Sequence, residues 1–460
     1  MKKILLPLAV LITGCVDIVE HGSPVELSLN MLACDRTTVV DGATHLRFTA
    51  KAGTNVVLSR TVPIDQAPHT VSIEPNADVM LQVDAFDGAG KLIARGSSIH
   101  FASPSETPIA IDLHRVGQFT RSCKDLVNPR AFHSATRLAD GRTLVVGGED
   151  STGAALSSME VVSSREIRDV GPLAISAQGN TFRLPRERHA AALLSNGQVV
   201  ISGGEDRVPL ASILVIDPPS GFQIGAVGPS PNPPSLRSRH LALNVNDGVV
   251  FIGGSTRTSQ IVANPTVEKL DATTMHVEAV SSIPDARLEA ALGRVGPVAI
   301  VAGGVENGTV SNKIDLISID QGGITRQLGL TTARRGGQLV THENAALLLG
   351  GFDSNGVALT LTEWINVDPP GSSVVAGPTI AARGDSCAVA LTLGRTLIFG
   401  SSRAPELLNA DGSIEPIAFA GAATSGESCT LAEDGSVLII GGLDNNGRPV
   451  DEVWRFQPSE

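Results

Sequence analysis

The chain has 460 residues, enough for two or three domains, and carries a formal net charge of −12 at pH 7. This acidic balance argues against nucleic acid or an anionic membrane surface as a partner. The 48 glycines and 27 prolines predict many short strands separated by turns, and the complete lack of tyrosine excludes chemistry that needs a phenol.

Residues 1–14 have the pattern of an export signal. Two lysines precede the apolar run 4–12, which is shorter than the roughly 20 residues that cross a bilayer. Ile12-Thr13-Gly14-Cys15 resembles a bacterial lipobox, which implies that Cys15 becomes lipidated and is the protein's only attachment to the membrane. Val16 follows in place of the aspartate that retains such proteins in the inner membrane, so the resemblance implies an outer-membrane lipoprotein facing the periplasm or the cell surface. The alternative is an ordinary signal peptide with a cysteine here by chance.

Residues 15–22 form a short linker, and residues 23–114 predict a separate β module. Seven segments alternate apolar with polar or small residues, a period that marks half-buried strands. Seven such strands in about ninety residues predict a small immunoglobulin-like β-sandwich. Asp87-Gly88 supplies a turn between two of them. The segments are 25–29, 45–48, 56–59, 71–73, 80–83, 93–95 and 109–113.

Residues 115–460 contain a unit that recurs seven times with a period of about fifty residues. Each unit has an arginine, a short apolar strand, a turn, and a second apolar strand that ends in a glycine pair. The arginines are Arg130, Arg186, Arg237, Arg287, Arg334 and Arg383; the seventh unit lacks one. The pairs are Gly147-Gly148, Gly203-Gly204, Gly253-Gly254, Gly303-Gly304, Gly350-Gly351 and Gly441-Gly442, with Gly400-Ser401 in the weaker sixth unit. An acidic residue opens a third strand in most units: Glu160, Glu268, Asp315, Glu363, Glu406 and Glu452.

This pattern resembles the kelch repeat, and the resemblance covers residues 116–460. It implies an all-β chain with a seven-bladed kelch-type β-propeller, or a six-bladed one if the sixth unit is not a blade. Glycine pairs let the chain turn where neighbouring blades crowd it. The last unit ends with its third strand, so we expect segment 116–126 to supply the missing fourth strand.

The histidines His133, His189 and His240 occupy one repeat position in three successive units. They could hold a metal, but later units have Ala290, Gly337 and Ser386 there, which favours histidines that hydrogen-bond inside their own blade. The six repeat arginines could bind an anion, and pairing with the acidic residue of each blade is favoured. We therefore assign no metal, catalytic or cofactor-binding residue.

Two further features have ordinary interpretations. The segments starting at Asp353 and Asp444 faintly resemble calcium loops but lack the later bidentate glutamate, so plain turns are favoured. Cys34, Cys123, Cys387 and Cys429 form an even set for an oxidising compartment. Cys387 with Cys429 and Cys34 with Cys123 are rival pairings that the sequence leaves open.

The residue content favours a binding module over an enzyme. Galactose-oxidase-like and sialidase-like propellers both need tyrosine and are excluded. A sugar-modifying, epimerase-like propeller stays open, although no local motif supports it. Carbohydrate binders stack sugar rings on tyrosine or tryptophan, and only Trp364 and Trp454 are present. We therefore expect an envelope or extracellular protein as the partner, with carbohydrate binding as the alternative.

Overall fold

The computed structural model describes residues 23–459 except 35, 69, 74–77, 104, 164–165, 178, 228–233, 246, 257–261, 321–322, 369–370, 423–424 and 433. The predicted export signal and Cys15 lie outside the described residues. Strands dominate the described part of the chain, which also has two short 3₁₀ turns, Ile64–Gln66 and Thr392–Gly394, so the expected all-β class is confirmed. Among the described residues, no helix has the length and apolar character needed to cross a membrane.

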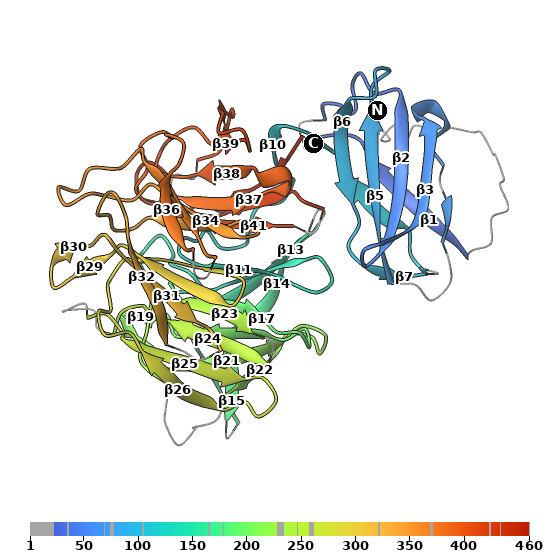
Figure 1. Ribbon diagram of the computed structural model, residues 1–460. Helices are drawn as coiled ribbons and strands as arrows, with labels where there is room; N and C mark the ends of the chain where they lie inside the picture. The colour runs from blue at the N-terminus through green and yellow to red at the C-terminus, as the bar shows by residue number, and fades with distance from the viewer. Residues whose placement is uncertain are drawn as a thin grey trace. The chain divides into compact units, whose positions relative to one another are not determined.

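The chain divides into two compact units, residues 1–123 with 457–460, and residues 124–456 (Figure 1). The first unit contains a strand at each of the seven predicted segments. A three-stranded sheet has the order β4-β1-β8, and a second sheet has the order β3-β2-β5-β6-β9, with β7 paired to β5. The bounds are β1 Ser23–Asn30, β2 His45–Ala52, β3 Asn55–Pro63, β4 Thr70–Ile73, β5 Asp78–Phe86, β6 Leu92–Ser97, β7 Phe101–Ala102, β8 Ile109–Asp112 and β9 His114–Arg115.

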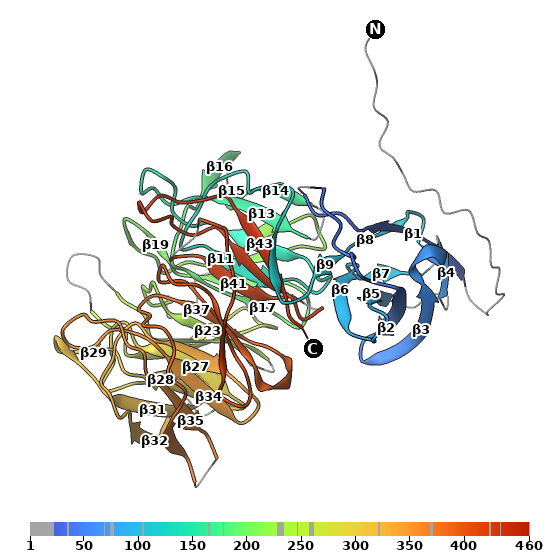
Figure 2. The same ribbon diagram turned by 90° about the horizontal axis from the view of Figure 1, so that it is seen from above.

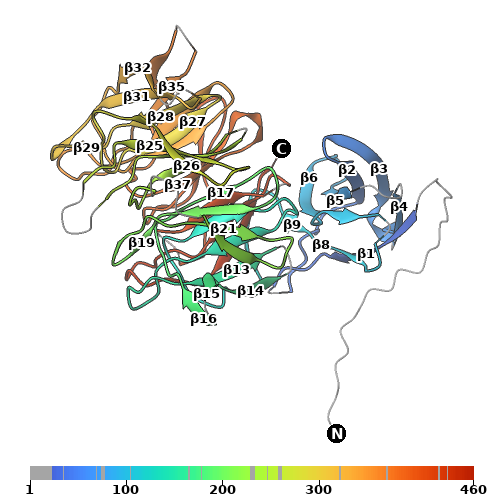
Figure 3. The ribbon, with the colours of Figure 1, turned by 90° about the horizontal axis from the view of Figure 1, so that it is seen from below.

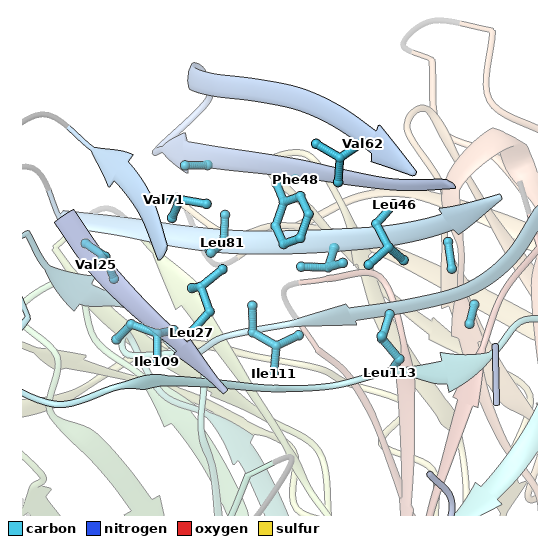
Figure 4. Packing of buried hydrophobic residues seen from close by; sticks show 14 of the residues in the cluster. Val25, Leu27, Leu46, Phe48, Val62, Val71, Leu81, Ile109, Ile111 and Leu113 are labelled. Carbon is cyan, nitrogen blue, oxygen red and sulfur yellow. The ribbon is translucent and has the colours of Figure 1, made fainter. Parts of the chain in front are cut away.

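The two sheets of the first unit enclose one apolar core. Phe48 and Leu81 point from the larger sheet toward Leu27 and Ile111 of the smaller one (Figure 4). Alternate residues of β1 and β2 are buried, because successive side chains of a strand point to opposite faces. The predicted turn at Asp87 is present, and its Oδ1 accepts hydrogen bonds from the backbone N–H groups of Ala89 and Lys91, both at 2.9 Å.

The repeats form seven four-stranded antiparallel sheets (Figures 1 and 2). The first four are β11 Ser134–Arg137, β12 Thr143–Val146, β13 Ser158–Val162, β14 Ile167–Pro172; β17 Ala190–Leu193, β18 Val199–Ser202, β21 Ile213–Asp217, β22 Gln223–Ala226; β23 Leu241–Val245, β24 Gly248–Ile252, β25 Thr266–Asp271, β26 Val277–Ser282; and β27 Ala291–Val295, β28 Val298–Ala302, β31 Lys313–Ser318, β32 Ile324–Gly329.

The fifth and sixth sheets are β33 Gln338–Thr341, β34 Ala345–Leu349, β35 Thr362–Asn366, β36 Ser373–Ala376; and β37 Cys387–Ala390, β38 Thr396–Phe399, β39 Glu406–Leu408, β40 Ile414–Pro416. The seventh consists of β41 Ser428–Leu431, β42 Val437–Ile440 and β43 Val453–Gln457, with β10 Gln118–Arg121 as its fourth strand, in the order β10-β43-β42-β41. This fourth strand comes from segment 116–126, as the sequence predicts. Three short hairpins complete the list: β15 Ala174–Ala177 with β16 Asn180–Arg183, β19 Glu205–Asp206 with β20 Val208–Pro209, and β29 Val305–Glu306 with β30 Thr309–Val310.

Each sheet packs against the sheets of the neighbouring repeats. Separate apolar clusters join the first sheet to the second, the second to the third, the third to the fourth, the fourth to the fifth, and the fifth to the sixth. Another cluster joins β42 and β43 of the seventh sheet to β12 and β13 of the first. Phe419 lies edge-on to both Phe399 and Trp454, which links the sixth and seventh repeats. The second strand of each repeat sheet is therefore buried along its length, except for the first residues of β28 and β34, Val298 and Ala345, which are half-buried.

The first strands of the sheets contact one another in order. β11 contacts β17, β17 contacts β23, β23 contacts β27, β27 contacts β33, β33 contacts β37, and β37 contacts β41. β41 also contacts β11, so the first and last sheets of the repeat unit lie side by side (Figure 2). Figure 3 shows the repeat sheets from below.

Candidate functional site

The repeat arginines are structural side chains of their own sheets. All six are almost completely buried, and each donates to the carbonyl oxygen of the first residue of the glycine pair of its own repeat. Five form ion pairs with the third-strand acid: Arg130–Glu160, Arg237–Glu268 (2.7 Å), Arg287–Asp315 (2.9 Å), Arg334–Glu363 (2.6 Å) and Arg383–Glu406 (3.1 Å). Because each guanidinium is bonded inside its own repeat, the six do not converge on a common anion.

Arg186 differs from the others because its repeat has no acid at the third-strand position. Its guanidinium donates to the Gly203 carbonyl at 3.0 Å and to the Ser212 hydroxyl at 3.1 Å. Burial without a neutralising carboxylate lowers the pKa of Arg186 to about 10, which leaves it charged at neutral pH.

The glycine pairs join consecutive repeats. The second glycine donates its N–H to the carbonyl oxygen of the next repeat's arginine, in five cases at 2.7–2.9 Å: Gly148 to Arg186, Gly204 to Arg237, Gly304 to Arg334, Gly351 to Arg383, and Gly442 to Arg130. The last of these bonds links the seventh repeat to the first. A Cβ on Gly147 would lie 2.2 Å from the Arg186 carbonyl oxygen, and its φ is +62°, so both space and backbone conformation require glycine.

The histidines lie between repeats, which differs from the expected bond inside one blade. His133 Nε2 is 2.8 Å from the Ser428 hydroxyl, His189 Nε2 is 2.7 Å from that of Ser134, and His240 Nε2 is 3.1 Å from that of Ser202. Each serine belongs to the preceding sheet, because the imidazole lies over a glycine of that repeat where no Cβ blocks it.

Burial and a neighbouring arginine lower the pKa of all three imidazoles, to about 3 for His189, so they are neutral at pH 7. Each imidazole is committed to its own serine, and no group of His, Cys, Asp or Glu side chains suited to a metal occurs within the described ranges.

The two aspartate segments are hydrogen-bonded turns. Asp353 Oδ1 accepts from the N–H groups of Asn355 and Val357, and Asp444 Oδ1 accepts from those of Asn446 and Arg448, at 2.8–2.9 Å. This geometry accounts for both segments without an ion.

Both cysteine pairings are formed, so they are not rivals. Cys34 and Cys123 are bonded in the first unit, and Cys387 and Cys429 join the sixth and seventh repeats, with Cα–Cα distances of 5.2 and 5.9 Å. Glu427, at the histidine position of the seventh repeat, lies beside the second disulfide, 3.5 Å from Cys387 Sγ. Burial, reinforced by the Asp385 carboxylate, raises the pKa of Glu427 to about 7.

Sequence reasoning missed a group of charged residues on the segments that enter the first strands. The second residue after the repeat arginine has a left-handed backbone in several repeats: Phe132, Arg188, Arg239 and Glu289 have φ between 51° and 56°. Bulky residues rarely adopt this conformation, and such strain concentrates at functional sites. The N–H of Arg188 donates to the Phe132 carbonyl, and the N–H of Arg239 donates to the Arg188 carbonyl, at 2.9 and 2.8 Å. This backbone chain holds the side chains of successive repeats next to one another.

We call Glu149, Glu187, Arg188, Glu205 and Arg239 the arginine–glutamate cluster. Arg188 lies over the Phe132 ring, 3.7 Å from its centroid, and forms ion pairs with Glu187, with Glu149 at 3.5 Å and with Glu205 at 3.6 Å. Arg239 reaches Glu205 at 3.4 Å and is about half exposed. Burial raises the pKa of Glu187 to about 7 against the lowering effect of Arg188, and Glu149 and Glu205 raise it further.

A cavity of about 350 Å³ opens beside the arginine–glutamate cluster. Its polar lining includes Glu187, Glu205, Arg207 and Arg239, and its apolar lining includes Ile283, Leu288, Leu292 and Val301. The sequence signal that could have located it is the loss of the repeat histidine at Ala290.

No protein-family model matches this chain, and no curated protein is similar to it. The site is therefore characterised by its own geometry: buried arginines and histidines that build the repeats, and a separate, mostly half-buried set of charged side chains beside a cavity.

Proposed function

We propose that the mature protein is an outer-membrane lipoprotein with a seven-bladed kelch-type β-propeller. In this proposal the propeller binds an envelope or extracellular protein through the face that carries the arginine–glutamate cluster. The order of the first-strand contacts, which returns from β41 to β11, supports seven blades over six. The hydrogen bond from the Gly442 N–H to the Arg130 carbonyl also supports a closed ring, because the same bond joins other pairs of consecutive repeats.

The observation that carries the binding proposal is the arginine–glutamate cluster. Its two arginines, Arg188 and Arg239, lie on backbone with positive φ in the segments before the first strands, and glutamates pair with both of them. A preorganised charged surface loses little side-chain entropy when it meets a complementary protein surface. Glu205 lies on β19, one of the segments that follow the glycine pairs, so two sets of connections supply the cluster.

Exposed apolar side chains on the connections after the glycine pairs add to this surface. Val208, Val262 and Val357 are 56%, 48% and 59% exposed. A mixed surface of aliphatic and charged groups suits a protein partner. Neither tryptophan lines the cavity, which leaves no large aromatic surface there for stacking a sugar.

The binding proposal is tested by crosslinking in intact cells that carry the anchored protein. Wild type is compared with Arg207→Glu/Arg239→Glu and with Arg168→Glu, a control at a half-exposed arginine of β14. We expect at least one crosslinked protein to be lost with the double variant and kept with the control. That protein, once purified, should bind wild type at least tenfold more tightly than the double variant.

Two outcomes would contradict the binding proposal. In the first, every crosslinked protein is recovered equally with all three proteins. In the second, no protein is enriched and the purified chain binds a glycan array, which would support the carbohydrate alternative.

The anchoring proposal has its own test. Cys15→Ser removes the thiol that the lipobox resemblance marks for lipidation, so the protein should move from the detergent phase to the aqueous phase in phase separation. Protease treatment of intact cells should then distinguish a surface-facing from a periplasmic molecule. Retention of Cys15→Ser in the detergent phase would refute the lipid anchor.

A further inference from the structure

The cavity beside the arginine–glutamate cluster lies where the fourth repeat lacks the histidine of the first three repeats. A Cβ placed on Gly147, Gly203 or Gly441 would lie 2.9–3.1 Å from the Cε1 atom of the histidine of the next repeat. The fourth repeat has Ala290 at this position. A Cβ on Gly253 would instead meet the methyl groups of Leu292 at 3.3 and 3.7 Å, and both Gly253 and Ala290 line the cavity.

The space is not closed by rearrangement of the neighbouring side chains. In the fifth repeat, where Gly337 also lacks the imidazole, Leu348 Cδ1 lies 3.1 Å from the position that a Cβ of Gly337 would take. In the fourth repeat the methyl groups of Leu292 take only part of the space over Gly253, and the cavity has a volume of about 350 Å³, within the range of small-molecule sites.

The inner wall of the cavity is apolar. Ile283 and Val301 are 2% and 3% exposed, and Leu292 and Ala290 complete this wall. Arg287 also lines the cavity, but its guanidinium is paired with Asp315 at 2.9 Å and carries no free charge. The inner wall therefore accepts an apolar group.

At the mouth of the cavity, Arg207 and Arg239 form fewer or longer ion pairs than the glutamates do. Glu187 is paired with Arg188, and Glu289 is paired with Arg335 at 2.6 Å. Glu205 is shared between Arg188 and Arg239 at 3.6 and 3.4 Å, so Arg239 has one distant partner. Arg207 is exposed and forms no ion pair with the described residues.

We propose that this cavity binds a small organic carboxylate, with its aliphatic tail against Ile283, Leu292 and Val301 and its carboxylate bonded to Arg207 and Arg239. Arginine binds carboxylates through parallel hydrogen bonds, and removal of an apolar tail from water adds free energy along its length. This site goes beyond the proposed protein binding and does not depend on it.

The experiment measures octanoate binding to the mature chain by titration calorimetry. Octylammonium and octanol serve as probes with the same tail and a positive charge or no charge. We expect octanoate to bind at least tenfold more tightly than either, and added salt to weaken it. Binding of octylammonium as tight as that of octanoate, or failure of octanoate to bind wild type, would overturn the proposal.

Two variants locate the site. Ala290→Leu places an apolar side chain in the gap and should abolish octanoate binding, while Ala154→Leu, a control at an exposed turn of the first repeat, should not change it. Unchanged affinity of Ala290→Leu would overturn the assignment. If Ala290→Leu does not fold, the surface variant Arg207→Gln/Arg239→Gln decides: at least tenfold weaker binding supports the site, and unchanged binding overturns it.

Discussion

The buried ion pair between Arg334 and Glu363 provides a sharp test of how the repeats are stabilised. Both side chains are 1% exposed, and Glu363 accepts two bonds, from Arg334 Nη2 at 2.6 Å and from the Thr331 N–H at 2.9 Å. Removal of the carboxylate leaves a guanidinium buried without a counter-charge. Breaking a buried pair in this way costs about 3–5 kcal/mol.

Two substitutions of Glu363 should lower the unfolding free energy by different amounts within that range. Glu363→Gln keeps one oxygen that can accept from Arg334, whose guanidinium also donates to the Gly350 and Leu361 carbonyls, so about 3 kcal/mol of unfolding free energy should be lost. Glu363→Leu removes both acceptors and should lose about 5 kcal/mol. Arg334→Met/Glu363→Leu should recover most of this loss, because no charge remains buried.

Urea unfolding monitored by tryptophan fluorescence measures these changes. Trp364 and Trp454 are the only tryptophans of the chain, and both lie in the unit formed by residues 124–456, so the signal reports on the repeats. Glu415→Gln, at an exposed glutamate of β40, is the matched control. If the unfolding free energy of Glu363→Leu lay within about 1 kcal/mol of that of this control, the buried ion pairs would not be stabilising the sheets as we argue.

Two further predictions concern the glycine pairs and the buried glutamate. Gly147→Ala should lower the unfolding free energy of the repeat unit by at least about 3 kcal/mol in urea unfolding, because the new Cβ clashes with the Arg186 carbonyl and the residue must also keep a positive φ. The control Gly197→Ala, at a glycine with positive φ and open space around it, should lower the unfolding free energy by about 1 kcal/mol. Equal losses for the two variants would contradict this explanation. The folded pKa of Glu427, raised to about 7 from an ordinary 4.5, means that the folded state binds the proton more tightly, so its contribution to stability is lost as pH rises from 4.5 through 7. Glu427→Gln should therefore stabilise the protein more at pH 8 than at pH 5, and an equal effect at both values would show that the carboxyl titrates normally.

Several features of this protein follow from its sequence alone. Alternating apolar residues located the strands of the first unit, because a strand buries every second side chain. The spacing of arginine, glycine pair and acid located the repeats, because each arginine bonds to groups of its own repeat, within 31 residues of it. Contacts between residues that are close in the chain can therefore be predicted from residue spacing.

Other features were decided only by the tertiary structure, because they depend on contacts between repeats. Each histidine bonds to a serine of the preceding sheet, which for His133 lies 295 residues away in the chain. The arginine–glutamate cluster gathers residues of successive repeats, and spacing within one repeat does not report how neighbouring repeats are placed. Ala290 is an ordinary alanine in the sequence. It marks a cavity only because the preceding repeat places Gly253 beside the position where an imidazole would lie.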